Sequence, residues 1–323
     1  MEYCGYKYEA DGKGYYNIIP NKEASMPKTF FKYYALNDYS VDALTNMYIY
    51  ASHPNQFNDP FDCNEKLVEF NTWDDVKNLW EPLFEKNKKD YLSLEDACTH
   101  CSYVYKTLLY RKLGLFSLAP RHDNYIMWSL YSQNNGFCVE FDIDQFPFNH
   151  YGPFPINYVD NIPSPVHVGQ SGGEVAMLIQ TNIKNKRWEH EQEWRLYIPN
   201  PLGVDIQSFG PEAGAFNIFN EHNRKFRYPI SAIKSIFLGT SFFDGDNIDV
   251  NVISNTEAEV VFKSNDSLTL KVLDFISRIQ LMFDLKVYHS NVEDFSECEF
   301  IPIVIARISE IRYRIIHACK INK

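Results

Sequence analysis

The chain has 323 residues, of which 45% are hydrophobic and 23% are charged. This balance is typical of a folded globular protein and excludes a disordered tail. The net charge of −11 argues against a broad basic surface for duplex nucleic acid. The first residues show no signal peptide, and no uncharged apolar run reaches the roughly 18 residues that span a bilayer. Seven scattered cysteines indicate reduced thiols, so we expect a cytoplasmic protein without a membrane segment.

The polar, Gly- and Tyr-rich residues 1–28 predict an irregular N-terminal arm. The elements expected next are a strand at 30–34, a helix at 41–46, a strand at 47–52, a turn-rich segment at 53–63, and helices at 73–86 and 93–112. The middle of the chain predicts a strand at 113–118, a short helix with Asp123 or Asn124 as N-cap, strands at 137–142 and 155–159, and a helix at 173–184. Beyond residue 230 we expect strands at 233–238, 286–288 and 301–305, and helices at 267–283 and 308–320.

Strands and helices interleave in this order without a regular βαβ rhythm, which predicts an α+β fold with a mixed central sheet and flanking helices. We divide the chain into the arm, a main domain at 29–240 and a smaller C-terminal α/β unit at 241–323. Aromatic residues make up 16% of the chain, and clusters of such rings often line clefts for small molecules. A small-molecule or nucleotide ligand is therefore expected, whereas the pattern does not define an oligomeric state.

Cys98 and Cys101 have the spacing of metal ligands. A structural zinc site needs four ligands, usually as two such pairs, and the sequence has no second pair. The two cysteines also share a helical stripe with Leu94 and Tyr105, which is typical of core residues. We therefore predict core packing and no metal. The chain also has no phosphate loop, nucleophile elbow or dinucleotide-binding glycine fingerprint.

Residues 188–195, with the sequence WEHEQEWR, concentrate charge beside tryptophan. If a strand begins at Glu191, then Glu191, Glu193 and Arg195 fall on one face and Trp194 on the other. One interpretation is an exposed strand with salt bridges of little energetic value. The other is a half-buried charged site, because charges that leave water need partners or a task.

Two further segments allow a structural and a functional interpretation. Residues 58–62 form a turn, since Asn and Asp side chains bond their own backbone and proline keeps the preceding residue extended. The alternative is that Asn58 or Asp59 projects into a cleft at the end of a strand. Trp128 and Tyr131 share one face of a short helix, where such aromatic pairs most often pack in the core.

Together these segments resemble a bacterial family catalogued as domain of unknown function 2971. The resemblance covers residues 30–240 and rests on residues 57–62, on 127–131 with 136–142, and on the pattern Trp188-x-x-Glu191-x-Glu193-Trp194-Arg195. The family often has a histidine before the glycine of its second segment, where this chain has Asn134 and Asn135. The family name carries no reaction.

The chain is also similar, more weakly, to ADP-ribosyltransferases, in which a late strand supplies a catalytic Glu, often as Glu-x-Glu. This similarity implies NAD as a substrate, Glu193 as the catalytic carboxylate and Glu191 as the residue that orients the acceptor. Breaking the nicotinamide–ribose bond builds positive charge on the ribose, which a fixed carboxylate stabilises. Arg195 would hold Glu193 ionised.

The same similarity assigns the remaining candidate residues to NAD binding. Lys32 stands where related chains have His, and it would meet the pyrophosphate. Tyr33 and Trp128 would stack on the nicotinamide or adenine ring. The other residues expected to bind the ligand are Ser52, Asn58, Asp59 and Tyr131.

Two alternatives from other classes stay open. The first is a non-catalytic, defence-associated module that binds a ligand or partner, in which Glu193 and Arg195 would pair with each other and be closed off from solvent. The second is a nuclease, in which Asp59, Asp62 and Glu193 would converge with Glu140 on a divalent ion.

Overall fold

The chain folds into two compact units, each built from interleaved segments. The structure is a computed structural model and describes residues 1–22, 25–57, 59, 61–80, 91–199, 224–294 and 297–317. Unit 1 comprises residues 1–26, 50–118 and 148–226; unit 2 comprises residues 27–49, 119–147 and 227–323. The short strands β5 (Tyr48–Tyr50) and β14 (Lys225–Arg227) lie where the chain passes from one unit to the other.

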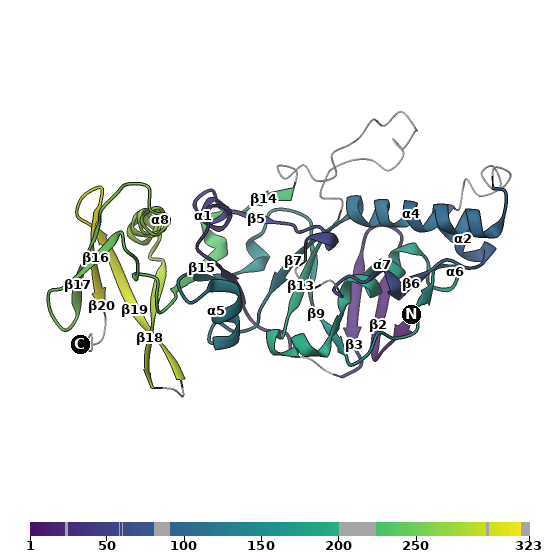
Figure 1. Cartoon of the computed structure of the whole chain (residues 1–323), viewed down its shortest axis with the longest axis horizontal. Helices are drawn as coiled ribbons and strands as arrows, with labels where there is room; N and C mark the ends of the chain where they lie inside the picture. Colours follow the sequence, from purple (N-terminus) through teal and green to yellow (C-terminus); the bar gives the residue numbers. More distant parts are fainter. Residues whose placement is uncertain are drawn as a thin grey trace, which may run out of the picture. The chain divides into compact units, whose positions relative to one another are not determined.

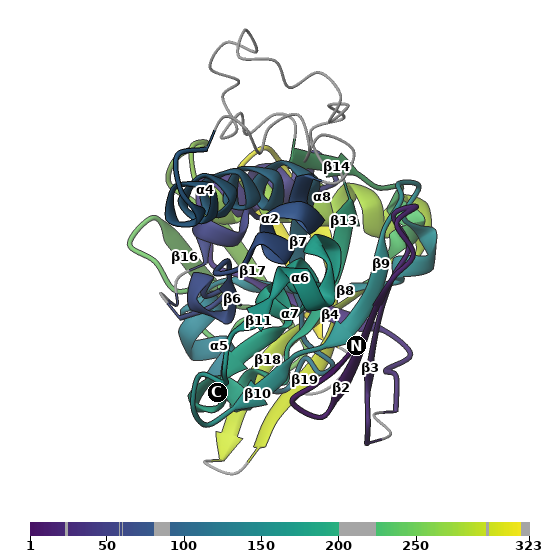
Figure 2. The same cartoon turned by 90° about the vertical axis from the view of Figure 1, so that its right-hand side faces the viewer.

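Unit 1 combines several small sheets with four described helices (Figure 1). Its first half contains β1 (Glu2–Tyr3), β2 (Tyr6–Ala10), β3 (Tyr16–Pro20), η1 (Pro54–Gln56), η2 (Glu65–Leu67), β6 (Val68–Glu69), α2 (Trp73–Trp80), α4 (Leu94–Lys112) and β7 (Leu113–Leu118). Its second half contains β9 (Tyr151–Pro155), β10 (Asn157–Val159), β11 (Val166–His167), α6 (Val168–Ser171), α7 (Gly173–Asn182), β12 (Ile183–Asn185), η5 (Lys186–Glu191) and β13 (Trp194–Pro199). Strand β13 is the middle strand of the antiparallel sheet β7-β13-β9, and α2 packs alongside α4 (Figure 2).

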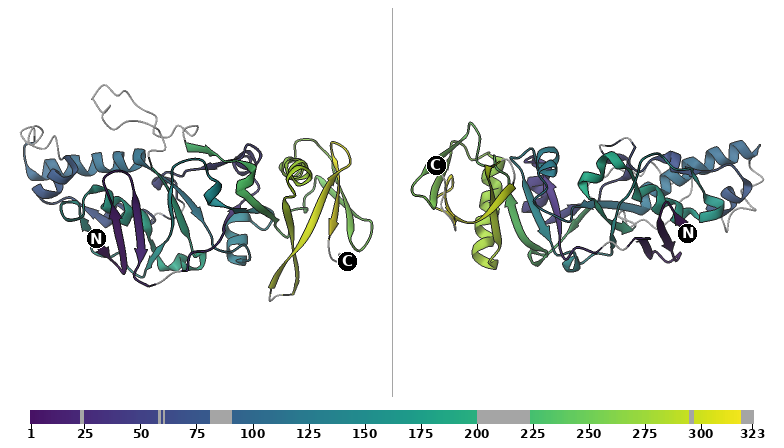
Figure 3. Two further views of the ribbon diagram at one scale, coloured as in Figure 1. Left: turned by 180° about the vertical axis from the view of Figure 1, so that it is seen from behind. Right: turned by 90° about the horizontal axis from the view of Figure 1, so that it is seen from below.

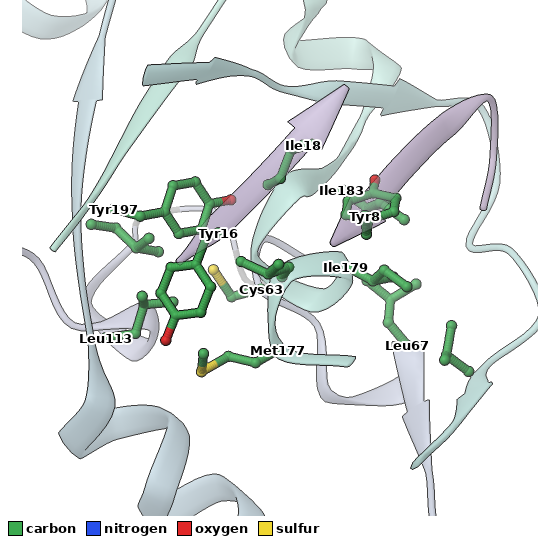
Figure 4. Packing of buried hydrophobic residues seen from close by; sticks show 13 residues of the cluster. Tyr8, Tyr16, Ile18, Cys63, Leu67, Leu113, Met177, Ile179, Ile183 and Tyr197 are labelled. Atoms are coloured by element: carbon green, nitrogen blue, oxygen red, sulfur yellow. The ribbon is translucent and has the colours of Figure 1, made fainter. Parts of the chain in front are cut away.

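The N-terminal segment is not the irregular arm that its composition suggests. Strands β1, β2 and β3 form an antiparallel sheet. Tyr8, Tyr16 and Ile18 alternate with exposed or half-buried residues and are themselves buried, so one face of the hairpin enters the core. In Figure 4 these side chains point toward Met177 and Ile179 of α7. The tyrosines that look like loop composition in the sequence therefore supply core area.

Unit 2 is built on one eight-stranded sheet of the order β16-β17-β20-β19-β18-β15-β8-β4. Its strands are β4 (Phe30–Tyr34), β8 (Phe137–Phe141), β15 (Ile233–Leu238), β16 (Ile248–Val252), β17 (Glu257–Phe262), β18 (Lys286–Asp294), β19 (Glu297–Arg307) and β20 (Arg312–His317). Its helices are α1 (Asp38–Thr45), α5 (Tyr125–Ser132) and α8 (Leu268–Phe283), with the short turns η4 (Ile143–Gln145) and η8 (Ile230–Ala232). Strands β15 and β18 run parallel and the other neighbours antiparallel, so the sheet is mixed and the expected α+β class is confirmed.

The two units divide the chain differently from the expected boundary at residue 240. Residues 241–323 belong to the same unit as residues 27–49 and 119–147. The cause is strand pairing: β8 hydrogen-bonds to β15 and to β4, which joins distant segments in one sheet. Helix α8, expected at 267–283, packs against β19 (Figure 3).

The last described element, β20, is a strand where the sequence suggested a helix at 308–320. Tyr313 and Ile315 are buried and their neighbours are not, which is the period of a strand. Strand β20 pairs with both β17 and β19, so its backbone groups are satisfied within the sheet. Among the described residues, no helix is both long and apolar enough to cross a lipid bilayer.

Strand geometry at β20 predicts a sharp difference between two neighbouring isoleucines. Ile315→Ala removes a fully buried side chain and should lower the free energy of unfolding by about 2–5 kcal/mol. Ile316→Ala, on the opposite face, should cost less than about 1 kcal/mol. Urea unfolding of both variants measures the difference. Equal losses would contradict the strand, because both residues would lie on the core side of an amphipathic helix.

Candidate functional site

The charged segment at 188–195 begins as a helical turn and becomes a strand only at its end. Asn185 caps η5 by accepting a hydrogen bond from the backbone N–H of Arg187. Gln192 then adopts a left-handed conformation with φ 48°, which ends the turn. Strand β13 starts at Trp194, so the expected strand from Glu191 onward is wrong for its first three residues.

Arg195 lies at the centre of a buried ion network, with 0% of its surface exposed. Its Nε donates to Oε1 of Glu193 at 2.8 Å, and its Nη2 contacts Oε2 of the same carboxylate at 3.2 Å. On the other side, Nη1 and Nη2 donate to the two carboxylate oxygens of Asp62 at 3.0 and 2.5 Å. A third acceptor is the backbone carbonyl of Thr181. The guanidinium fork is thus bound by two carboxylates in the bidentate geometry that suits arginine.

Lys184 is the second cation of the network and is 4% exposed. Its Nζ donates to Oε2 of Glu191 at 2.6 Å and to Oε2 of Glu193 at 3.0 Å, and lies 3.7 Å from Oδ2 of Asp62. The indole of Trp188 lies 5.2 Å away, within cation–π range. One ammonium group therefore occupies the space between three carboxylates.

Neighbouring groups hold the network in position. The ring of Phe57 lies 4.5 Å from the guanidinium carbon of Arg195. The backbone N–H of Glu193 donates to the hydroxyl of Tyr158 at 2.8 Å. Cys63 and Tyr197, which neighbour the network in sequence, belong to the core cluster that includes Met177 and Ile179 of α7 (Figure 4). Ring contacts, a backbone hydrogen bond and the adjoining core thus hold the ions in position.

The charges in the network favour one another's ionised forms. Burial alone would raise the pKa of Glu193, but Arg195 and Lys184 outweigh it and hold that pKa well below its usual range. Burial would lower the pKa of Lys184, and the nearby carboxylates of Glu193 and Glu191 raise it instead. The pKa of Arg195 is raised in the same way, mainly by Asp62 and Glu193 against the effect of burial.

The carboxylate oxygens of Glu193 are already occupied by hydrogen bonds within the chain. Oε1 accepts from Arg195, and Oε2 accepts from both Lys184 and Arg195. The residue is 5% exposed. The carboxylate is therefore already engaged by two cations and closed off from solvent, and breaking either contact would leave a buried charge without its partner.

Lys184 is not among the residues that the sequence assigned to a site, and Asp62 appears there only in the nuclease alternative, together with Glu193. Asp62 belongs to the turn at 58–62, and Lys184 lies in β12. The contact between Asp62 and Arg195 joins segments 133 residues apart, which no local pattern reveals. The sequence offers one sign of a buried ion network, which is the high density of charged residues beside Trp188 and Trp194. Charged side chains are buried only when they are paired.

The other candidate residues of unit 1 serve the backbone. Ser52 forms a bridge with Leu115 through its N–H and C=O groups. Asp59 is buried, and its Oδ1 accepts from the N–H of Phe61 at 2.9 Å, as expected for a turn. Asn58 lies outside the described residues.

The candidates of unit 2 form part of an aromatic core. Tyr33 and Trp128 are buried, and their rings meet edge to face at 5.3 Å. The hydroxyl of Tyr33 donates to the carbonyl of Arg121, and Nε1 of Trp128 donates to the carbonyl of His122. The two rings therefore do not offer a free face for stacking on a base.

Two half-buried residues complete the candidates of unit 2. Tyr131 lies on α5 and packs against the cluster that contains Tyr33 and Trp128. Lys32 lies on β4 in register with Val139 of β8. The candidate residues are thus divided between two units, and within unit 1 the structure brings together Glu191, Glu193 and Arg195.

Cys98 and Cys101 are buried and pack with Val76 and Ala97, which confirms the expected core packing. No group of three or more His, Cys, Asp or Glu side chains among the described residues is arranged to hold a metal ion. This agrees with the role of Lys184, whose ammonium group takes the position between the carboxylates.

A cleft of about 900 Å³ lies elsewhere in unit 1, between β6 and α4. Its rings come from Phe70 and Tyr103, and its carboxylates from Glu69 and Glu95. Lys106 also lines it and forms an ion pair with Glu65. The cleft thus combines apolar surface with acidic groups.

Comparison of this chain with protein-family models, with curated proteins and with solved structures gives no match. The resemblance to the family of domain of unknown function 2971 and the similarity to ADP-ribosyltransferases therefore stay predictions.

The network predicts that Glu193 contributes to stability. Glu193→Gln removes one charge of a buried ion pair and should lower the free energy of unfolding by about 3–5 kcal/mol. Glu189→Gln is the matched control, because Glu189 lies nearby in η5 and is exposed, and it should change stability by about 0.5 kcal/mol or less. Denaturant unfolding followed by circular dichroism measures both. Equal stability of the two variants would contradict a structural role.

The lowered pKa of Glu193 also predicts a dependence of stability on pH. Its stabilisation is fully present above the pKa of an unfolded Glu, about 4.3, and is lost as pH falls further, because the unfolded state then binds a proton that the folded state does not. As the pH falls from about 4.3 to about 3, the stability of the wild type should therefore approach that of Glu193→Gln. Unfolding curves at several pH values test this. A constant difference would contradict it.

Proposed function

We propose that this chain is a non-catalytic binding protein in which the segment from Glu191 to Arg195 is a structural ion network. The observation that carries the proposal is the closed pairing of Glu193 with Arg195, in which both oxygens of the carboxylate are bound and neither residue is open to solvent. A catalytic carboxylate must touch the reacting atoms. A carboxylate that neutralises a buried guanidinium has a structural role instead.

The alternative reactions demand arrangements that the described residues do not favour. A transferase would need Glu193 to face a bound ribose, whereas its neighbours are Arg195 and Lys184. A nuclease would need carboxylates around a divalent ion. Here Asp62, Glu191 and Glu193 surround an ammonium group.

The cleft between β6 and α4 is the place where we propose that a small ligand binds. Phe70 and Tyr103 contribute aromatic side chains to its lining, and Glu69 and Glu95 make the surroundings acidic. Carboxylates repel phosphate and attract cations, so the chemistry favours a neutral or cationic ring compound over a nucleotide. We also propose a reducing, cytoplasmic setting, which the free thiols of the described cysteines support.

The proposal predicts that purified protein does not split NAD. Nicotinamide release, followed by chromatography after incubation with NAD, should stay at the level of the buffer for the wild type, for Glu193→Gln and for Glu189→Gln. Circular dichroism and unfolding curves of the same samples should show that Glu193→Gln alone is destabilised.

The opposite pattern would overturn the proposal. It consists of release by the wild type and by Glu189→Gln, loss of release in Glu193→Gln, and unchanged stability of that variant. This result would assign Glu193 to catalysis and make the transferase the working hypothesis.

A further inference from the structure

The outer edge of β16 is the end of the eight-stranded sheet of unit 2 (Figure 1). Among the described strands, β16 hydrogen-bonds to β17 alone. The N–H of Lys263 donates to Asn247, and the N–H of Ile253 donates to Glu257. In an antiparallel pair these bonds recur at every second residue, so residues 249 and 251 bond inward to β17. The backbone groups of residues 248, 250 and 252 therefore point outward, although the N–H of Ile248 bends back to the carbonyl of Gly245.

The apolar layer of the sheet stops abruptly at this edge. Val250 lies beside Val260 of β17, and Val252 lies beside Ala258. Val260 is 1% exposed, whereas Val250 is 47% and Val252 is 52% exposed. The inner neighbours are covered, and no described strand lies on the other side of the edge residues. Proteins usually protect such edges with charge or proline.

We propose that β16 pairs with β16 of a second copy of this chain, antiparallel about a two-fold axis at Val250. In this register Val250 faces its own copy, and Ile248 faces Val252 of the other chain. The outward N–H and C=O groups of the two Val250 residues then bond to each other. The N–H of each Val252 meets the free carbonyl of the opposite Ile248. The sheets of two molecules become one, and the exposed valines cover each other.

Charge selects this register over its neighbours. With the axis at Val250, Asp249 of one chain faces Asn251 of the other. An axis at Asp249 would set two carboxylates opposite each other, which is unfavourable. An axis at Asn251 would leave Ile248 without a partner. The side chain of Asp249 is already paired with Lys263 on its own chain, at 3.0 Å, so the favoured register adds no unpaired charge.

The opposite edge of the sheet is not equivalent. There Phe31 of β4 exchanges two backbone hydrogen bonds with Ala119, at 2.8 and 2.7 Å. This bridge occupies outward groups of β4 that a second chain would need. Edge pairing is therefore expected at β16, and it yields a closed dimer because a two-fold contact uses the same surface on both copies.

Sedimentation of the full-length chain over a range of concentrations tests the proposal. We expect a reversible monomer–dimer equilibrium, since two five-residue strands bury less than the roughly 1,200 Å² typical of stable complexes. Asn251→Asp sets like charges opposite each other at two positions, and should weaken dimerisation at least about fivefold. Asn251→Lys sets an ammonium group opposite Asp249 at both positions, and should strengthen it about two- to fivefold.

Val250→Pro is the backbone test. Proline removes an N–H that points away from β17, so the strand can tolerate it while the central bonds of the dimer are lost. We expect dimerisation to weaken at least about tenfold, with the circular dichroism of the wild type retained. If this variant fails to fold, the opposite effects expected of the two Asn251 variants still test the proposed dimer. A wild type that stays monomeric throughout overturns the proposal, and so does a dimer that both Asn251 variants leave unchanged.

Discussion

The constraint on which unit 1 depends is the complete burial of the Arg195 guanidinium. An arginine cannot release its proton to escape an apolar environment, so burial is tolerable only if carboxylates and carbonyls meet its N–H groups. Those acceptors come from Asp62, Glu193 and the carbonyl of Thr181. They belong to the turn before η2, to the link between η5 and β13, and to the end of α7. One side chain thus joins three segments, and the turn with Asp62 lies 133 residues before Arg195.

Arg195 also explains why a structural segment has the composition of a catalytic one. A buried guanidinium needs carboxylates as partners, and a second buried cation beside it needs a further carboxylate. Lys184 shares Glu193 with Arg195 and adds Glu191 to the set. Together with Asp62, the Glu-x-Glu-x-Arg pattern gives both buried cations carboxylate partners in a low-dielectric interior. Residue types alone cannot distinguish this task from catalysis. The difference lies in whether the carboxylate oxygens are free.

The sequence predicted those elements whose signals are local. Strands at 113–118 and 233–238 were correct because short apolar runs are bounded by breaks in the pattern. Asn124 caps α5 as one of the two predicted residues. The segment at 308–320 failed because its isoleucines fit a helical stripe as well as an alternating strand, and only pairing with β17 and β19 decides between them. The interleaved units were not predictable, since pairing of β8 with β15 joins segments about a hundred residues apart.

The site shows the same division between local and long-range information. That Glu193 and Arg195 share one site followed from their spacing of two residues. The participation of Asp62, 133 residues before Arg195, did not follow from any spacing. Each unit also departs from the rule that charged side chains are exposed and apolar side chains are buried. Unit 1 buries charged groups that are normally solvated, and unit 2 exposes valines at β16 that are normally covered. The first exception is satisfied within the chain by pairing, whereas the second finds no partner among the described strands. A second copy supplies that partner without altering the ion network, so assembly and stability can be separated by substitution.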